Sequence, residues 1–423
     1  MTFVEAPLPG GARLVTVPLP GRASVAVSLL VGVGSRYEAA ADSGISHFVE
    51  HMVFKGGRRY PTARAISEAI EGVGGVLNAA TDRESTVFWT RVPATSLPLA
   101  AAVLTDMVLY PAFDPAEVIK ERQVVIEELR MYEDNPQEYA QIVFDEVMWP
   151  EHPLGRDVAG TEATVTSFTA EDCRAHLDRY VRPSRVVVSV AGAVDPDAAH
   201  RLFSAELEEW AARDQRPEAR PAPPASPPDG PRLRIARRAT EQATVLVGAR
   251  SASYLDPERY AEDILNAILG EGMSSRLFLE LREQRGCVYD VHSFVTRFRD
   301  SGATTIGLGC EPKRAVTALR AALAELRRLA GELVGDAEML KAREFVKGRL
   351  LLSLESTSAL GEYAGHQLLL TGTILDPAEI IAQLEAVSAE DVRRAARRVL
   401  DEGLRGAVVG PFRSSTRFEG LLR

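Results

Sequence analysis

The sequence has few cysteines, no long apolar run and no basic start. Its three cysteines, Cys173, Cys287 and Cys310, are scattered and odd in number, so they form no paired disulfide framework and favour a reducing compartment. No stretch of about eighteen apolar residues is present, which excludes a membrane-spanning helix. The first residues lack the basic segment of a signal peptide, and prolines interrupt the apolar residues that follow. We therefore expect a cytoplasmic protein with no membrane partner.

The chain also lacks an excess of positive charge. A net charge of -10 and a pI near 5.4 give no support to a nucleic-acid partner. Its 423 residues exceed the size at which a single core stops growing, so two domains are expected. Prolines crowd the segment 214–232, where neither a helix nor a central strand can continue. We predict an N-terminal domain over 1–213, a linker over 214–232 and a C-terminal domain over 233–423.

Histidine is scarce as well, with seven residues, yet two of them lie four positions apart in the motif His47-Phe48-Val49-Glu50-His51. Residues four apart share one face of a helix, so both imidazoles can bind a single zinc ion. Glu50 stands beside them as a candidate general base. On the wheel, the opposite side carries an apolar stripe of Ile45, Phe48, Val49, Met52 and Val53. The pattern predicts a helix that is buried on one face and presents a metal site on the other.

The same segment carries signals for both ends of a helix. Asp42 or Ser43 is the predicted N-cap, because a short polar side chain can accept a hydrogen bond from the first free amides. The pair Gly56-Gly57 is the predicted C-terminal stop. These signals predict a helix of about three turns.

A catalytic zinc normally takes three protein ligands, so a third must come from elsewhere. The segment 114–133 predicts a second helix that begins with an N-cap aspartate and a proline. Its wheel places Glu121 and Glu128 inside an apolar stripe that comprises Val118, Val124, Val125, Leu129 and Tyr132. Burying a carboxylate is costly unless a cation is near. We predict Glu128 as the third ligand and Glu121 as an acid behind the ligands, whereas Glu127 points away and is an ordinary solvated acid.

These motifs together resemble the inverzincin metallopeptidases of the insulinase, pitrilysin and mitochondrial processing peptidase family, in their short bacterial form. The inverted motif of that family, His-x-x-Glu-His followed by a distant glutamate, matches His47, Glu50, His51 and Glu128. Further similarity lies in the runs 54–56, 77–81 and 121–128. The resemblance implies one Zn2+ per chain, bound by the two histidines and Glu128, with water activated by Glu50.

The resemblance also implies substrate-binding residues. Asn78 matches a residue on an edge strand that pairs with the substrate backbone. Arg282 and Tyr289 match an arginine and tyrosine pair that grips a substrate carbonyl and helps to stabilise the tetrahedral intermediate, a role that requires positioned donors.

The two halves of the chain are related. Residues 116–129 and 337–350 are identical at six of fourteen positions. In the second copy Glu121 is replaced by Ala342 and Glu128 by Arg349, so that copy has lost any metal site. Short strands such as 24–33 and 243–249 alternate with long helical patterns. We predict an α+β fold of two homologous domains from an internal duplication, each a largely antiparallel sheet packed with helices.

The expected activity is zinc-dependent endopeptidase action on short or unfolded peptides. The resemblance implies a clamshell chamber, of which one chain of two repeats supplies half, and hence a homodimer or a heterodimer with an inactive relative. Two alternatives stay open: a non-catalytic or structural subunit, and a maturation peptidase dedicated to one precursor. Retention of all the predicted metal residues favours an enzyme over a structural subunit.

Overall fold

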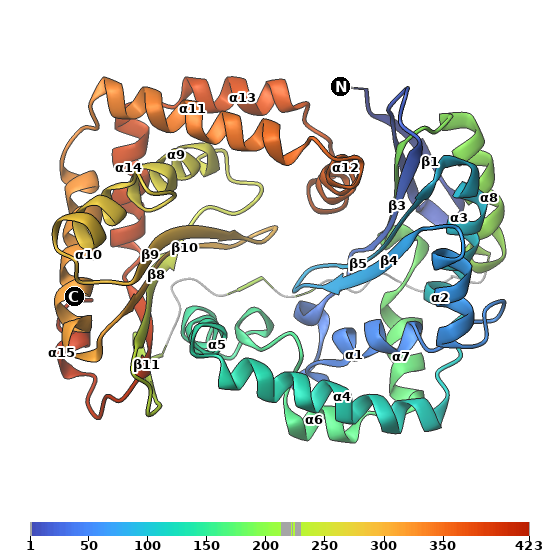
Figure 1. Cartoon of the computed structure of the whole chain (residues 1–423), viewed down its shortest axis with the longest axis horizontal. Helices are drawn as coiled ribbons and strands as arrows, with labels where there is room; N and C mark the ends of the chain where they lie inside the picture. Colours follow the sequence, from blue (N-terminus) through green and yellow to red (C-terminus); the bar gives the residue numbers. More distant parts are fainter. Residues whose placement is uncertain (1, 213–220, 222, 225–229, 423) are drawn as a thin grey trace. The chain divides into compact units, whose positions relative to one another are not determined.

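A computed structural model describes residues 2–212, 221, 223–224 and 230–422 (Figure 1). The chain forms two compact units, each described by itself. Unit 1 comprises Met1–Arg130, Asp157–Ala222 and Leu352–Asp376. Unit 2 comprises Met131–Arg156, Pro223–Leu351 and Pro377–Arg423. Most of the predicted linker, 214–232, lies outside the described residues.

Unit 1 contains a mixed sheet of six strands. In spatial order they are β1 (Val4–Pro7), β2 (Arg13–Pro18), β6 (Val186–Gly192), β3 (Ser24–Val31), β5 (Thr86–Pro93) and β4 (Val76–Thr81). Neighbouring strands pair antiparallel except β2 and β6, which run parallel. The central strands β3 and β6 are buried along nearly their whole length, as their valine-rich sequences predict. The strand predicted over 24–33 is confirmed by β3.

Helices cover both faces of this sheet. The helices of the unit are α1 (Ile45–Val53), α2 (Ala63–Glu71), α3 (Leu97–Leu109), α4 (Pro115–Asp134), α6 (Glu162–Ser167), α7 (Ala170–Tyr180), α8 (Pro196–Ala211) and α12 (Thr357–Thr371), not all of which contact the sheet. Alternate residues of β3, such as Val27 and Leu29, join α1 and α3 in the main core. Leu30 points to the other face, where it contacts α12. The two-residue period of the strand thus places apolar side chains against helices on both sides.

Helix α12 lies unusually close to the sheet because it presents glycines to it. A side chain at Gly365 would lie 2.6 Å from the Leu30 side chain. One turn earlier, the Ser189 hydroxyl donates a 2.7 Å hydrogen bond to the Gly361 carbonyl. A Cβ at Gly361 would make only ordinary contact, 3.4 Å from the Ala191 side chain, so Gly365 is the position at which a larger residue would push the helix away from β3.

Unit 2 repeats the sheet of unit 1 with one strand fewer. Its spatial order is β7 (Leu233–Arg237), β11 (Arg405–Gly410), β8 (Ala243–Arg250), β10 (Gly302–Cys310) and β9 (Asp290–Arg297). The first pair runs parallel and the others antiparallel, as in the series from β2 to β4 of unit 1. The shared order confirms the predicted internal duplication. The strand predicted over 243–249 is confirmed by β8.

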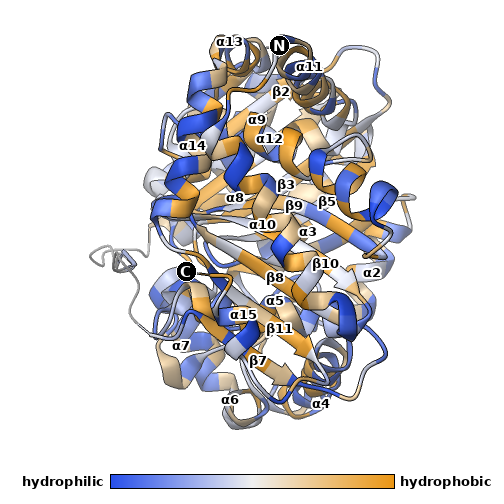
Figure 2. Ribbon diagram, turned by 90° about the vertical axis from the view of Figure 1, so that its left-hand side faces the viewer, coloured by the Kyte–Doolittle hydropathy of each residue, from blue (hydrophilic) through white to orange (hydrophobic). Residues whose placement is uncertain are grey.

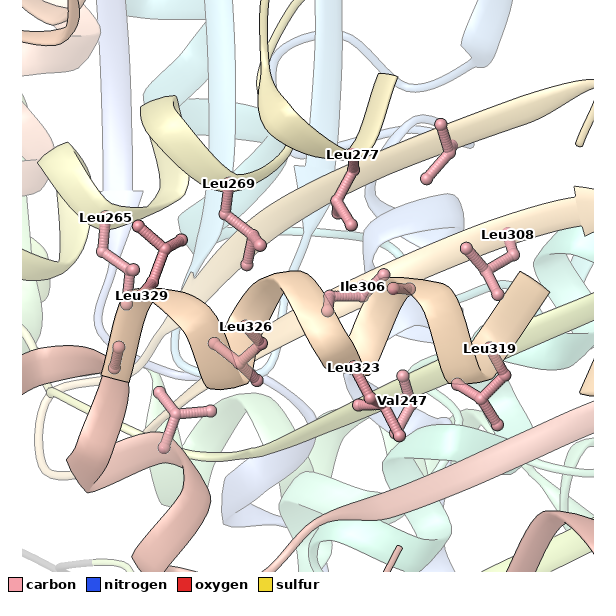
Figure 3. Close-up of a cluster of buried hydrophobic side chains, with 14 of the residues drawn as sticks. Val247, Leu265, Leu269, Leu277, Ile306, Leu308, Leu319, Leu323, Leu326 and Leu329 are labelled. Carbon is pink, nitrogen blue, oxygen red and sulfur yellow. The ribbon is translucent and has the colours of Figure 1, made fainter. Parts of the chain in front are cut away.

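The core of unit 2 lies between its sheet and a helical layer. The helices of the unit are α5 (Pro136–Met148), α9 (Arg259–Leu269), α10 (Ala315–Gly331), α11 (Asp336–Ser353), α13 (Pro377–Ala386), α14 (Ala389–Asp401) and α15 (Thr416–Glu419). Figure 3 shows Leu319, Leu323 and Leu326 of α10 near Val247 and Ile306 of the sheet. All five are at most 2% exposed. Each such side chain contributes roughly 1.5 to 3 kcal/mol on burial.

The two halves of the sequence exchange one helix each. Helix α5 comes from the N-terminal half but packs on β8 and β11 of unit 2, whereas α12 comes from the C-terminal half and packs on β3 and β6 of unit 1. The contiguous domains predicted over 1–213 and 233–423 therefore differ from the compact units. Periodicity shows that a helix has an apolar face but not which sheet covers that face.

Apolar residues concentrate on the strands, whereas most helices alternate apolar and polar positions (Figure 2). Within the described part of the chain, no helix combines the length and the apolar character needed to cross a bilayer.

Candidate metal centre

Helix α1 has the two-sided character that its sequence predicts. Its five apolar positions are each at most 6% exposed and belong to the core of unit 1: Ile45, Phe48, Val49, Met52 and Val53. His47, Glu50 and His51 lie on the other side and are only partly buried. The two imidazole centroids are 4.6 Å apart. The buried stripe thus fixes the direction in which the motif points.

The start of α1 differs from the prediction. Gly44, not Asp42 or Ser43, occupies the N-cap position, with a φ of 96°. A side chain at Gly44 would lie 2.4 Å from the Ala159 carbonyl oxygen. The buried Glu38 carboxylate accepts hydrogen bonds from the amides of Gly44 and Ser46, each at 2.8 Å. An acid outside the helix therefore caps it, which no local cap signal reveals.

Helix α4 supplies the acids. Asp114 caps it as predicted, since its carboxylate accepts from the Ala116 amide at 2.7 Å. The predicted apolar stripe was partly wrong: Val124 is 51% exposed, and Ile126 is buried instead. Glu121 is buried, whereas Glu127 is exposed and pairs with Arg130 at 2.7 Å. The assignment of Glu127 as a solvated acid is thus confirmed.

Three candidate ligand atoms meet where α1 and α4 face each other. Glu128 Oε2 lies 3.8 Å from His47 Nε2 and 3.6 Å from His51 Nε2. All three ligand atoms lie within 4.8 Å of one another. Ligand atoms about 2.0 to 2.2 Å from a tetrahedral zinc are separated by about 3.4 Å, so these residues fit zinc with small side-chain adjustments.

A chain of polar contacts extends behind His51. Its Nδ1 lies 2.9 Å from Glu121 Oε1, and Glu121 Oε2 lies 2.5 Å from Lys55 Nζ. Burial opposes ionisation of Glu121, but its hydrogen bonds with His51 and Lys55 lower the pKa of this carboxyl overall. An ionised acceptor on Nδ1 leaves Nε2 of His51 free for a metal and orients the ring. The sequence predicted that Glu121 lies behind the candidate ligands, but it did not predict the ion pair of Glu121 with Lys55.

The pKa values of the two histidines are shifted in opposite directions. Burial, reinforced by the neighbouring His51, lowers the pKa of His47 to about 4. Burial also disfavours charge on His51, but the hydrogen bond to Glu121 and the nearby carboxylates raise its pKa overall. His47 Nδ1 is buried without a hydrogen-bond partner among the described residues. His47 is therefore neutral near pH 7, the state in which imidazole binds a metal.

Glu50 has surroundings suited to a general base. Burial raises the pKa of its carboxyl, opposed in part by the 2.6 Å hydrogen bond that the Thr81 hydroxyl donates. A cavity of about 20 Å³, lined mainly by apolar residues such as Val49, Val53 and Phe88, adjoins it. Thr81 ends strand β4 and thereby ties the motif helix to that strand. No sequence signal identified this contact.

Asn78 lies on β4, which is an edge strand of the unit 1 sheet. It is opposite Trp89 in the register with β5, and its side chain accepts from the Ala79 amide at 2.9 Å. The strand therefore leads along the open side of the sheet to Thr81 and Glu50.

Arg282 and Tyr289 belong to unit 2 and are described within it. Arg282 lies in the helical segment Phe278–Gln284, with its guanidinium 5.1 Å from the Phe278 ring centroid. Tyr289 directly precedes β9 and is 53% exposed, while its amide donates to the Gly309 carbonyl at 2.7 Å. Both side chains are accessible to a ligand of unit 2.

The second repeat replaces the acids of α4 as predicted. Ala342 is buried, and Arg349 is paired with Glu271. Ser293 of β9 donates to the Asn266 side chain of α9 at 2.6 Å, much as Thr81 of β4 donates to Glu50 of α1. The ion pair of Arg349 with Glu271 and the side chain of Asn266 thus stand in unit 2 where unit 1 has a candidate ligand and a candidate base.

Replacement of Lys55 by methionine is expected to weaken zinc binding by about tenfold, the lower end for residues behind a ligand. The physical reason is that Glu121 would lose the cation that favours its ionised form and would hold His51 less firmly. The measurement is zinc affinity by competition with a chromogenic chelator. Lys120→Met on the exposed side of α4 is the matched control, and Lys55→Arg should restore most of the affinity. Equal affinities for Lys55→Met and the control would contradict the role of Lys55.

His176 of α7 is buried, with Nε2 3.4 Å from the Ser46 hydroxyl. Burial lowers its pKa to about 4. The unfolded chain therefore binds the extra proton first as pH falls from about 6.5 to about 4, and the folded state loses up to about 3 kcal/mol in that window. We expect metal-free His176→Gln protein to show a smaller fall in thermal midpoint between pH 7 and pH 4.5 than metal-free wild type. Equal falls in both proteins would refute the assignment.

The chain matches two family models along most of its length. Residues 13–162 match the model described as insulinase (peptidase family M16), and residues 167–346 match the one described as peptidase M16 inactive domain. An uncharacterized zinc protease from Streptomyces coelicolor is 36% identical over 96% of this chain and 89% of its own length. The chain belongs to the M16 peptidase family. A second uncharacterized zinc protease of Bacillus subtilis is 35% identical over 95% of this chain and 96% of its own length.

Solved structures agree on the M16 fold. A protease from Helicobacter pylori has a TM-score of 0.91 at 24% identity, covering 97% of this chain and 99% of its own. A peptidase M16 inactive domain from Pseudomonas fluorescens has a TM-score of 0.89 at 18% identity, covering 98% and 99%. The match to the "inactive domain" model includes most of the second repeat, in which the candidate metal ligands are not retained. The relatives support a peptidase-type function for this M16 chain.

Proposed function

We propose that this protein is a zinc-dependent endopeptidase with one zinc ion per chain, bound by His47, His51 and Glu128. The observation that carries the proposal is the meeting of three ligand atoms within 4.8 Å of one another, with Glu50 on the same helix. The names of the relatives add support, because they describe zinc proteases.

A zinc ion bound there would act as a Lewis acid that makes water a stronger acid and polarises the substrate carbonyl. Glu50 is the residue that accepts the proton of the attacking water and later donates it to the leaving amine. Burial raises the pKa of the Glu50 carboxyl, which makes its carboxylate a stronger base for the first of these steps. Thr81 holds one carboxylate oxygen and thereby orients the other.

The proposed substrates are short or unfolded peptides in extended form. Edge strand β4 can pair with a peptide backbone without regard to its side chains, and Asn78 lies on it. In the same proposal, Arg282 and Tyr289 bind a substrate carbonyl and support the developing negative charge. An enclosed chamber would select against folded proteins. The three free, buried thiols fit the expected cytoplasmic location.

The test is digestion of a mixed peptide pool by zinc-loaded protein, with the products identified by mass spectrometry and a chelated sample as control. Cleavage of many unrelated peptides supports the general endopeptidase. Cleavage confined to one sequence context favours the dedicated maturation peptidase. No cleavage by protein with verified zinc favours the non-catalytic subunit.

We further propose a homodimer in which each site uses residues of both chains, with a heterodimer as the alternative. Mixing inactive Glu50→Gln chains with inactive Tyr289→Phe chains should then restore up to about a quarter of wild-type activity, because one mixed pairing carries both intact residues. The measurement is peptide cleavage after unfolding and refolding the mixture, with each variant refolded alone as control. Active protein that sediments only as a monomer would contradict the dimer.

A further inference from the structure

Among the described residues, no strand pairs with the outer edge of β7 in the unit 2 sheet. It is the terminal strand and pairs with β11 alone among the described strands (Figure 2). Gly406 donates to the Arg232 carbonyl at 2.8 Å, and Arg238 donates to the Gly410 carbonyl at 3.0 Å. The backbone N–H and C=O groups of the even-numbered residues of β7 therefore face β11. Because strand backbone groups alternate, those of Leu233, Ile235 and Arg237 point away from it.

The first repeat shows what such an edge accepts. Its strand β2 occupies the position of β7, with a parallel neighbour on one side in each sheet. On the other side of β2, strand β1 pairs antiparallel in the register of Val4 with Thr16 and Pro7 with Arg13. No strand in the described part of unit 2 takes that place. The fold itself thus accommodates an added short strand at this edge.

A basic groove runs beside the open edge. It has a volume of about 780 Å³ and is lined by Leu233, Arg234, Ile235, Arg237, Phe412, Arg413, Ser414 and Ser415. None of the described residues that line it is acidic. The residues come from β7 and from the segment between β11 and α15, so the groove and the strand edge form one continuous surface within unit 2.

Two guanidinium groups in this groove are available to a ligand. Arg234 is paired with Glu146. Arg237 and Arg413 are exposed, and neither has an acidic partner among the described residues. Unsatisfied arginines bind carboxylates through paired hydrogen bonds. Their presence on a chain of net charge -10 makes the groove a local exception.

We propose that the β7 edge binds an extended acidic peptide segment as an added strand. The segment pairs through its backbone with Leu233, Ile235 and Arg237, as β1 pairs with β2, and its carboxylates contact Arg237 and Arg413. This site is separate from the proposed catalytic residues and does not depend on their activity. Charged side chains also protect strand edges from aggregation, so the test must separate binding from protection.

The probe is a fluorescein-labelled peptide of about ten residues that alternates glutamate with valine, followed by fluorescence anisotropy on the full chain. Glu50→Gln protein is used so that the probe stays intact. Arg237→Ser/Arg413→Ser should weaken binding by at least about tenfold, since charge-assisted hydrogen bonds are lost. Arg22→Ser/Arg417→Ser removes the same charge at exposed positions outside the groove and should leave binding unchanged. A probe with glutamine in place of glutamate should bind as weakly as the double groove variant does.

Backbone pairing is tested with modified probes. Two probes are compared, one N-methylated at the odd-numbered residues of the peptide and one at the even-numbered residues. One of them should lose binding and the other should keep it, because only one of these two sets of amides faces β7. Several outcomes would overturn the proposal: equal binding by the glutamine probe, unchanged binding by the groove variant, or equal sensitivity to both methylation registers. Displacement of the probe by inorganic triphosphate at equal concentration would also overturn it, in favour of a phosphate site. If the groove variant self-associates but still binds the probe fully, then the two arginines only protect the strand edge from aggregation.

Discussion

Replacing Glu50 with glutamine is expected to lower peptide cleavage by at least about a hundredfold while zinc stays bound, the lower end for removal of a general base. Glutamine has the same shape and can still accept the Thr81 hydrogen bond, so α1 and β4 stay in contact. It cannot accept the proton of water. Turnover of a quenched fluorescent peptide and zinc content by atomic absorption should be measured on the same sample.

The matched control is Glu127→Gln, which makes the same chemical change on the exposed side of α4. It should retain wild-type turnover. Loss of zinc from Glu50→Gln would show that Glu50 is a ligand, and retained turnover would show that another group accepts the proton.

The second large effect concerns the acids of α4. Glu128→Gln is expected to empty the site, because Glu128 Oε2 is the atom that faces both imidazoles. Glu121→Gln should weaken zinc binding by roughly 10 to 100-fold, as removal of a partner behind a ligand does. Glu127→Gln should have no effect. The measurement is zinc content after dialysis against a graded series of chelator concentrations.

The order in which these three variants lose zinc identifies the ligand on α4. If Glu121→Gln lost zinc more readily than Glu128→Gln, then Glu121 would be the ligand and the Lys55 contact an unrelated ion pair. If Glu127→Gln lost zinc while Glu121→Gln and Glu128→Gln kept it, then α4 would be rotated by one residue relative to its described position.

The candidate metal site was predictable from the sequence to the extent that its residues are close together in the chain. His47, Glu50 and His51 lie within one helix, whose geometry fixes their relative positions. The third acid was inferred from the cost of burying a carboxylate, although one valine of the stripe was assigned to the wrong face. Lys55, Thr81 and Glu38 were not given roles, because their contacts depend on how α1 meets α4, β4 and the preceding loop.

The fold was predictable in its elements and in its duplication. Strands such as β3 and β8 show continuous apolar runs, and α4 and α11 share a pattern that survived divergence. The exchange of α5 and α12 was not predictable, since the apolar face of a helix does not show which sheet covers it. Only tertiary packing decides between them, as the close approach at Gly365 shows.

That exchange has a consequence for biosynthesis. The hydrogen-bond partner of Ser189 on β6 is Gly361, which is synthesised 172 residues later. During translation, the faces of β3 and β6 that α12 will cover therefore emerge exposed and remain so until most of the second repeat has left the ribosome. The first repeat cannot complete its fold alone, and a chain stopped between the repeats would be a target for chaperones and proteases rather than a smaller active protein.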